Sequence, residues 1–257
     1  MTRTPQGDRT ARRVWGRSLA VALFLAGAVS RADADGFCEG ERERAQSTVQ
    51  RIEREWPLRG SGDAISAYMQ ALMERLARRS NGNGFPWRVN VIRNRAANAF
   101  AIGGGHIYVT DGALAFAEDE SELAAILAHE MGHQLSGHFC RQGPPPSLWS
   151  GLFSGAGGAP AARTRGVGSL SLVVDLAKEQ EADRRALDLL TAGGYNPQAM
   201  LEVAKRLPSG GSSAHLHDPR RTQALENSMT GRSAIRTASS EEFHTTKRKL
   251  QKELADW

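Results

Sequence analysis

The stretch Glu122-Leu-Ala-Ala-Ile-Leu-Ala-His-Glu-Met-Gly-His133 decides the fold. Its apolar residues recur at steps of three and four, which predicts an amphipathic helix with one buried face. Asp119 and Glu122 have the spacing of a capping box, so we expect the helix to begin at Asp119. The same periodicity continues as far as Leu135.

Two histidines of this helix, His129 and His133, are four residues apart and therefore share a face. At that spacing both imidazoles can reach one zinc ion, and Glu130 beside them can take a proton from a metal-bound water. The alternative is a solvent-facing helix that happens to contain two histidines. The apolar flanks and the small residues Ala128 and Gly132 argue against it.

A zinc ion with one open position needs a third protein ligand from a different element. Glu179 and Glu181, in the next helix that the sequence predicts, compete for this role. His106, His138 and His244 lack metal-ligand spacing with the pair, so we expect surface or structural roles for them.

The rest of the periodicity predicts a mainly helical α+β fold with a small antiparallel sheet beside the helix that carries His129. The expected strands are 87–92, 97–102 and 106–110, with the glycines 103–105 before the last one. The expected helices are 41–79, with Asp63 as an N-cap, then 119–135, 169–191 and 197–207, followed by a charged helical extension over 241–257.

Residues 1–34 read as a signal peptide: arginines precede the apolar run Leu19–Val29, and Ala32-Asp-Ala34 follows it. The run has 11 residues, against the roughly 20 that a membrane-spanning helix needs. Six Arg and two Asp leave with this segment, so the net charge falls from +5 to +1 and gives no argument for a nucleic-acid partner. We expect a secreted protein with one domain over 35–257 and no transmembrane segment in the mature chain.

The two cysteines, Cys38 and Cys140, would reach an oxidising compartment, where a disulfide or two free thiols are the alternatives. Residues 142–169 are rich in Gly, Pro, Ala and Ser, and we expect a long mobile loop over or beside the site. Trp149 and Phe153 within it could pack on the core, contact substrate or contact lipid.

Several motifs together resemble zinc metallopeptidase family 48, which includes HtpX, BepA and the type I CAAX prenyl proteases. The resemblance covers about residues 60–225. It rests on Asn98-Ala-Phe-Ala101, the glycines 103–105, Ile107-Tyr-Val-Thr110, Glu122 to His133, Glu179-Gln-Glu-Ala-Asp183 and Ala192-Gly-Gly-Tyr-Asn-Pro197.

This resemblance implies a zincin-like peptidase domain that holds one zinc ion per chain. It makes Glu179 the third ligand and Asp183 a hydrogen-bonding partner of a ligating histidine, and the two lie one helical turn apart. Glu181 is then a solvated surface acid.

The family also places a histidine six residues before an arginine, to stabilise the oxyanion of the tetrahedral intermediate. His215 and Arg221 have this spacing. Leu216 replaces the usual proline after the histidine, and His217 is a close rival for the role.

The run Asn98, Ala99, Phe100, Ala101 resembles the family's edge strand, which would bind an extended substrate by main-chain hydrogen bonds; a plain core strand is the alternative. Gly103 stands where many members have proline.

The function that follows is a zinc-dependent endopeptidase that hydrolyses internal peptide bonds, with Glu130 as general base. By resemblance alone, the setting is envelope protein quality control in the periplasm, and the partners are protein or peptide substrates such as misfolded or unassembled envelope proteins. One rival is a zinc-containing, chaperone-like binding protein with latent or little peptidase activity. Another is an envelope scaffold that acts through Trp149, Phe153 and the basic run Lys247-Arg-Lys249.

Overall fold

The computed structural model describes residues 37–80, 82–140, 175–206, 219–230, 232, 235 and 237–256. The expected signal peptide, the 142–169 loop and the two candidate histidines His215 and His217 lie outside the described residues. Within them the elements are α1 (Glu41–Glu55), α2 (Ala64–Arg78), β1 (Arg88–Ile92), β2 (Ala99–Ala101), β3 (His106–Thr110), α3 (Asp111–Phe116), α4 (Glu120–Leu135), α7 (Leu176–Gly193), α8 (Gln198–Arg206), α9 (Pro219–Met229) and α10 (Glu241–Ala255).

The expected fold class, mainly helical with one small sheet, is confirmed, but the sheet is mixed and not antiparallel. Its order is β1-β3-β2: β3 pairs with β2 antiparallel and with β1 parallel. Four of the five β3 residues are buried, so this strand takes the central place and is paired on both sides. Residues 93–98 carry the chain past β3 to its far side, which makes β1 and β3 run in the same direction.

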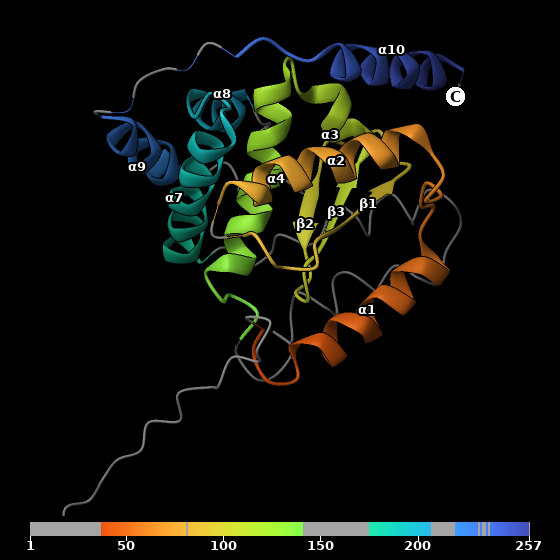
Figure 1. The fold of residues 1–257 in the computed structure, drawn as a ribbon, viewed down its shortest axis with the longest axis horizontal. Coiled ribbons are helices and arrows are strands. Elements are labelled where there is room, and N and C mark those ends of the chain that lie inside the picture. The colour runs from red at the N-terminus through yellow and green to blue at the C-terminus, as the bar shows by residue number, and fades with distance from the viewer. Residues whose placement is uncertain are drawn as a thin grey trace, which may run out of the picture.

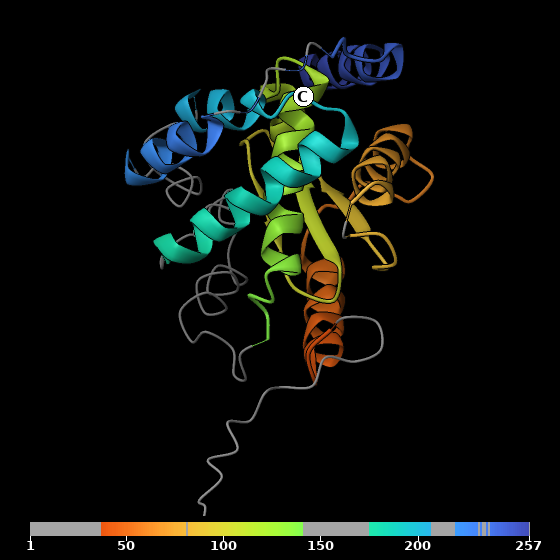
Figure 2. The same cartoon turned by 60° about the vertical axis from the view of Figure 1, so that its left-hand side comes forward.

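The two faces of the sheet are covered by different helices, as the alternation of side chains along a strand requires. Val91 and Val109 point into the main core with α2 and α4. Ile92 and Tyr108 point the other way and pack with Ile52 of α1. Figures 1 and 2 show α4 between the sheet and α7, so this helix is surrounded by the fold.

Local signals in the sequence explain most helix boundaries. Asp63 caps α2 and Asp119 caps α4, each by accepting a hydrogen bond from a backbone N–H two or three residues ahead, as expected. The helical stretch expected over 41–79 consists of two helices, α1 and α2, with a break before the Asp63 cap. Trp56 is extended because it precedes Pro57, and proline disfavours helical geometry in the residue before it.

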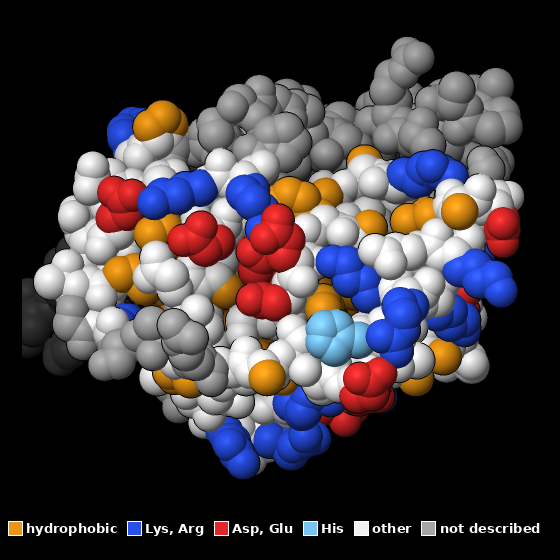
Figure 3. Space-filling view, turned by 90° about the horizontal axis from the view of Figure 1, so that it is seen from above, with side chains coloured by type: hydrophobic (Ala, Val, Ile, Leu, Met, Phe, Trp, Pro, Cys, Tyr) orange, Lys and Arg blue, Asp and Glu red, His pale blue; other side chains and the backbone are white. Residues whose placement is uncertain are grey.

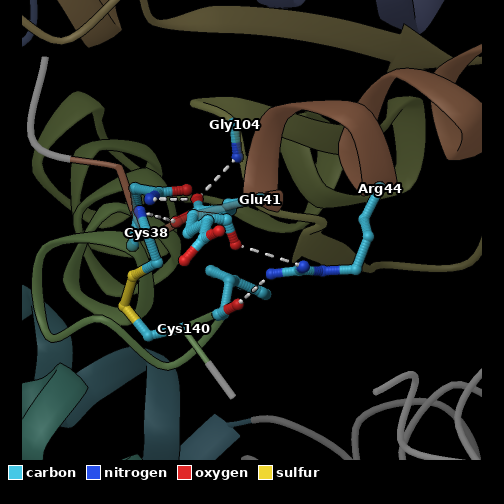
Figure 4. The surroundings of a disulfide bond; sticks show 8 residues. Cys38, Glu41, Arg44, Gly104 and Cys140 are labelled. Carbon is cyan, nitrogen blue, oxygen red and sulfur yellow. Dashed lines mark hydrogen bonds between the residues drawn. A yellow bond between two sulfur atoms is a disulfide. The ribbon is translucent and has the colours of Figure 1, made fainter. Parts of the chain in front are cut away.

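Cys38 and Cys140 are joined in a disulfide, which ties the segment before α1 to the segment after α4 (Figure 4). The buried carboxylate of Glu41 lies beside this bond. It accepts hydrogen bonds from the Cys38 amide (3.1 Å), the Gly104 amide (2.8 Å) and the Gln134 side chain (2.7 Å). The start of α1, the β2–β3 turn and the end of α4 are therefore held at one point.

On the face seen in Figure 3, acidic and basic side chains are interspersed with scattered apolar ones. Among the described residues, none of the helices combines the length and the apolar character that crossing a bilayer requires.

Candidate metal centre

Three candidate ligands from two helices meet at one point. His129 and His133 come from α4 and Glu179 from α7. The two Nε2 atoms are 3.1 Å apart, and the Glu179 carboxylate oxygens lie 3.2 Å from His129 Nε2 and 3.5 Å from His133 Nε2. All three ligand atoms fall within 4.8 Å of one another, which is the spacing of groups that share a metal ion.

Gly132 explains how the two helices come so close. A Cβ atom at this position would stand 2.4 Å from the backbone oxygen of Ala182 on α7, well inside any allowed contact. A side chain here would push α7 away and move Glu179 out of reach of the two histidines.

The donor set fits zinc, which binds imidazole nitrogens and carboxylate oxygens in this combination. Nδ1 of His129 lies 2.9 Å from Oδ1 of Asp183, so the ring carries its proton there and turns the Nε2 lone pair toward His133 and Glu179. Such convergent lone pairs repel one another unless a cation lies between them. Burial and Arg221 lower the pKa of His129, but hydrogen bonds to Asp183 and Glu179 outweigh them and raise it to about 9. The carboxylates around His129 thus favour a positive charge at the point where a metal cation would bind.

Asp183 is itself held by a buried arginine. Arg221 of α9 donates from Nε to Oδ2 (2.6 Å) and from Nη2 to Oδ1 (2.5 Å). The guanidinium thus binds this carboxylate in a bidentate manner. Burial alone would raise the pKa of Asp183, but the Arg221 charge lowers it, so the residue stays ionised beside His129. The sequence identified Arg221 only as a spacing marker for His215; its contact with Asp183 could not be read from the sequence.

Glu130 lies on the same turn as His129, with 5 % of its surface exposed. Its Oε2 accepts a hydrogen bond from the Ala101 amide of the edge strand β2 (2.9 Å). Burial raises the pKa of Glu130 above its ordinary value, which suits a carboxylate that must accept a proton and release it in the same reaction.

The predicted substrate strand is β2, at one edge of the sheet. Its residues divide between two sides of the sheet. The Phe100 ring stacks on Tyr108 (5.3 Å between centroids) and points toward α1, away from the site. The start of the strand faces an apolar pocket beside the candidate ligands, lined by Ala97, Asn98, Ala99, Ala113, Phe116, Ile126, His129, Glu130, Met200 and Val203.

One histidine outside the predicted ligand set lies against a candidate ligand. His138 was expected in a surface or structural role, yet its Nδ1 lies 2.8 Å from Nδ1 of the candidate ligand His133. Its Nε2 lies 3.4 Å from Glu181, the acid expected to be only solvated. The available signal was the sequence Gly137-His138 just after the helix, where a glycine can turn the chain back.

Comparison with known proteins agrees with this geometry. The model of Peptidase family M48 matches residues 64–229, from α2 to α9. The beta-barrel assembly-enhancing protease of Escherichia coli (strain K12) is 29% identical over 170 residues, which cover 58% of this chain and 35% of that protein. The protein of the same name in Yersinia pestis is 30% identical over 158 residues, or 56% of this chain and 32% of the relative.

The mitochondrial metalloendopeptidase OMA1 of Schizosaccharomyces pombe is 32% identical over 100 residues, or 38% of this chain and 30% of that protein. The chain thus spans about a third of the length of the curated relatives it matches. The predicted resemblance is confirmed by the family match, and the predicted enzyme class, a metalloendopeptidase, agrees with the names of these relatives.

Proposed function

The chain belongs to peptidase family M48, and on that premise we propose that it hydrolyses internal peptide bonds with one zinc ion held by His129, His133 and Glu179. The observation that carries the proposal is the convergence of these three ligand groups beside the buried Glu130.

Zinc bound by these residues would activate a water and polarise the scissile carbonyl. Glu130 would accept a proton from the attacking water and deliver it to the leaving amine, and burial raises its pKa, which suits a group that must do both. Asp183 and Arg221 keep His129 in the tautomer that presents Nε2 to the metal. His215, by family resemblance, is the proposed support for the oxyanion.

The proposed substrate is an extended polypeptide laid along Asn98 to Ala101, at the edge of the described sheet that β2 forms. Glu130 accepts a hydrogen bond from the Ala101 amide. A bound peptide would compete for that amide and leave Glu130 able to accept a proton from the attacking water. The apolar pocket lined by Ile126, Met200 and Val203 lies at the start of this strand, beside Glu130.

The biological role that we propose is quality control of misfolded or unassembled envelope proteins in the periplasm. It is supported by the name of the Escherichia coli relative, a beta-barrel assembly-enhancing protease, and by the export signal expected in residues 1–34. The scaffold alternative is weakened at one point: the Lys247 ammonium bonds the Ala117 carbonyl and lies over the Phe243 ring, and so is engaged within the protein.

The test is to measure bound zinc and casein cleavage for the wild type, Glu130→Gln and Glu179→Ala, with Asp188→Ala as a surface control on the helix of Glu179. We expect the wild type and the control to bind one zinc and cleave. Glu130→Gln should keep zinc and lose about 10²–10⁴-fold in rate, and Glu179→Ala should lose zinc. Equal zinc binding by all four proteins without cleavage would reject the third ligand and favour the chaperone-like alternative.

A further inference from the structure

The end of α4 folds back on itself in a defined way. Gly137 has a φ of +66°, a left-handed conformation that glycine adopts without strain. Its amide donates to the Gln134 carbonyl (3.0 Å), and the His138 amide donates to the His133 carbonyl (3.1 Å). This pair of bonds is a Schellman motif, in which the second residue past the helix usually packs an apolar side chain on the last turn. Here that position holds a histidine, and it packs on His133.

The two rings are joined by a short nitrogen–nitrogen contact of 2.8 Å between their Nδ1 atoms. One nitrogen must donate and the other accept. A His133 that binds metal through Nε2 carries its proton on Nδ1 and donates it to His138. His138 then accepts at Nδ1 and carries its own proton on Nε2, where the Glu181 carboxylate lies 3.4 Å away. Every donor in this chain of three side chains meets an acceptor.

The segment that carries His138 is anchored from outside the helix. Cys140 donates its amide to the Gly137 carbonyl (3.0 Å) and is bonded to Cys38. Arg44 donates to the Phe139 carbonyl (3.2 Å), on the other side of the same segment (Figure 4). The His138 side chain is only 8 % exposed. Its ring is therefore held in place before any metal arrives.

We propose that His138 is a positioning residue of the zinc site: it fixes the tautomer and the orientation of His133, as Asp183 does for His129. The inference rests on the proposed zinc site and adds to it a second oriented ligand, supported from the end of the same helix. Partners of this kind typically change metal affinity by about 10–100-fold when they are removed.

The experiment compares His138→Leu with His138→Asn by zinc competition against a chromophoric chelator and by thermal unfolding of the metal-free proteins. Leucine keeps bulk and suits the apolar contact of the Schellman motif, but it cannot accept a hydrogen bond. Asparagine places an amide oxygen near the position of Nδ1. His244→Leu, on α10, is the control for loss of a histidine.

We expect His138→Leu to weaken zinc binding by about 10–100-fold, with His138→Asn recovering most of the loss and His244→Leu matching the wild type. The metal-free His138→Leu and His138→Asn proteins should unfold at similar temperatures. The inference is overturned if the two His138 variants bind zinc equally, whether as tightly as the wild type or equally weakly. If the wild type itself binds no zinc, the proposed function fails and not this inference alone.

Discussion

Among the residues that the structure describes, two arginines are buried with carboxylates around them, and they have different roles. Arg221 gives two nitrogens to Asp183, which in turn holds His129 in the candidate metal centre. Arg59 also grips one carboxylate with two nitrogens, that of Asp111 (2.6 and 3.0 Å), and it binds Asp63 and Glu253 as well. The first cluster orients a proposed metal ligand, and the second joins the loop before α2 to α3 and α10.

Burial and charge pairing alone therefore do not identify a functional side chain. The pKa values of the two aspartates, Asp183 and Asp111, shift in opposite directions. The Arg221 charge overcomes burial and lowers the pKa of Asp183, whereas burial raises the pKa of Asp111 despite its bonds to Arg59. The neighbouring charge of Glu253 adds to the rise at Asp111. What distinguishes the functional cluster is its contact with His129.

Arg221→Met should have the largest effect, because it acts on both stability and metal binding. It leaves the buried Asp183 carboxylate without its cation, at a cost of about 3–5 kcal/mol in the free energy of unfolding. Asp183 would then favour a protonated His129, which competes with zinc, so zinc affinity should fall at least about tenfold. Urea denaturation and zinc titration measure the two effects.

The matched control for that substitution is Arg232→Met, which removes an exposed ion pair with Asp188. It should cost at most about 1 kcal/mol and leave zinc binding as in the wild type. An Arg221→Met protein with unchanged zinc affinity would reduce Arg221 to a purely structural residue and remove the contrast with Arg59.

Arg59→Met should reduce stability by a similar amount, about 3–5 kcal/mol, because Asp111 is fully buried and would lose its cation. Zinc affinity of the folded protein should remain that of the wild type, since the partners of Arg59 lie outside the metal centre. Urea denaturation and zinc titration measure these two effects as well. A large loss of zinc affinity at wild-type stability would show that this cluster is coupled to the site.

The sequence predicted those parts of the fold that depend on residues close together in the chain, and it failed for those that depend on distant residues. The helix around His129 and the caps at Asp63 and Asp119 follow from spacing within a few residues, and the structure agrees. Strand order is set by burial across the whole chain, so the parallel pairing of β1 with β3 could not be read from alternation. The short helix α3 has too few residues to show a period.

The site divides in the same way. The spacing of His129 and His133 and the family resemblance led to the residues that meet at the metal centre. The hydrogen bonds between Arg221 and Asp183 join residues 38 positions apart. The spacing of residues in the sequence does not predict this contact. His138 was missed for another reason: it has no ligand spacing, and only the left-handed turn at Gly137 brings its ring onto His133.

The smallest expected effect separates two carboxylates on the same arginine. Burial would raise the pKa of Asp63, but the Ile65 amide, the Arg59 charge and the Ser66 amide lower it, whereas the pKa of Asp111 is raised. A depressed carboxylate pKa gives stability that is present above the ordinary value of 3.8 and is lost as the pH falls below it.

Asp63→Ala should therefore cost about 1 kcal/mol near pH 7, by loss of the cap of α2, and progressively less below pH 3.8. Asp63→Asn keeps a capping oxygen but cannot titrate, so its stability should exceed that of Asp63→Ala by an amount that stays constant with pH. At Asp111 the sign reverses, because the folded protein takes up this proton before the unfolded chain does, and acidification at first favours folding. Carboxyl carbon NMR shifts followed through an acid titration should show Asp111 protonating before Asp63 as the pH falls. The reverse order would contradict a raised pKa at Asp111 and a lowered pKa at Asp63.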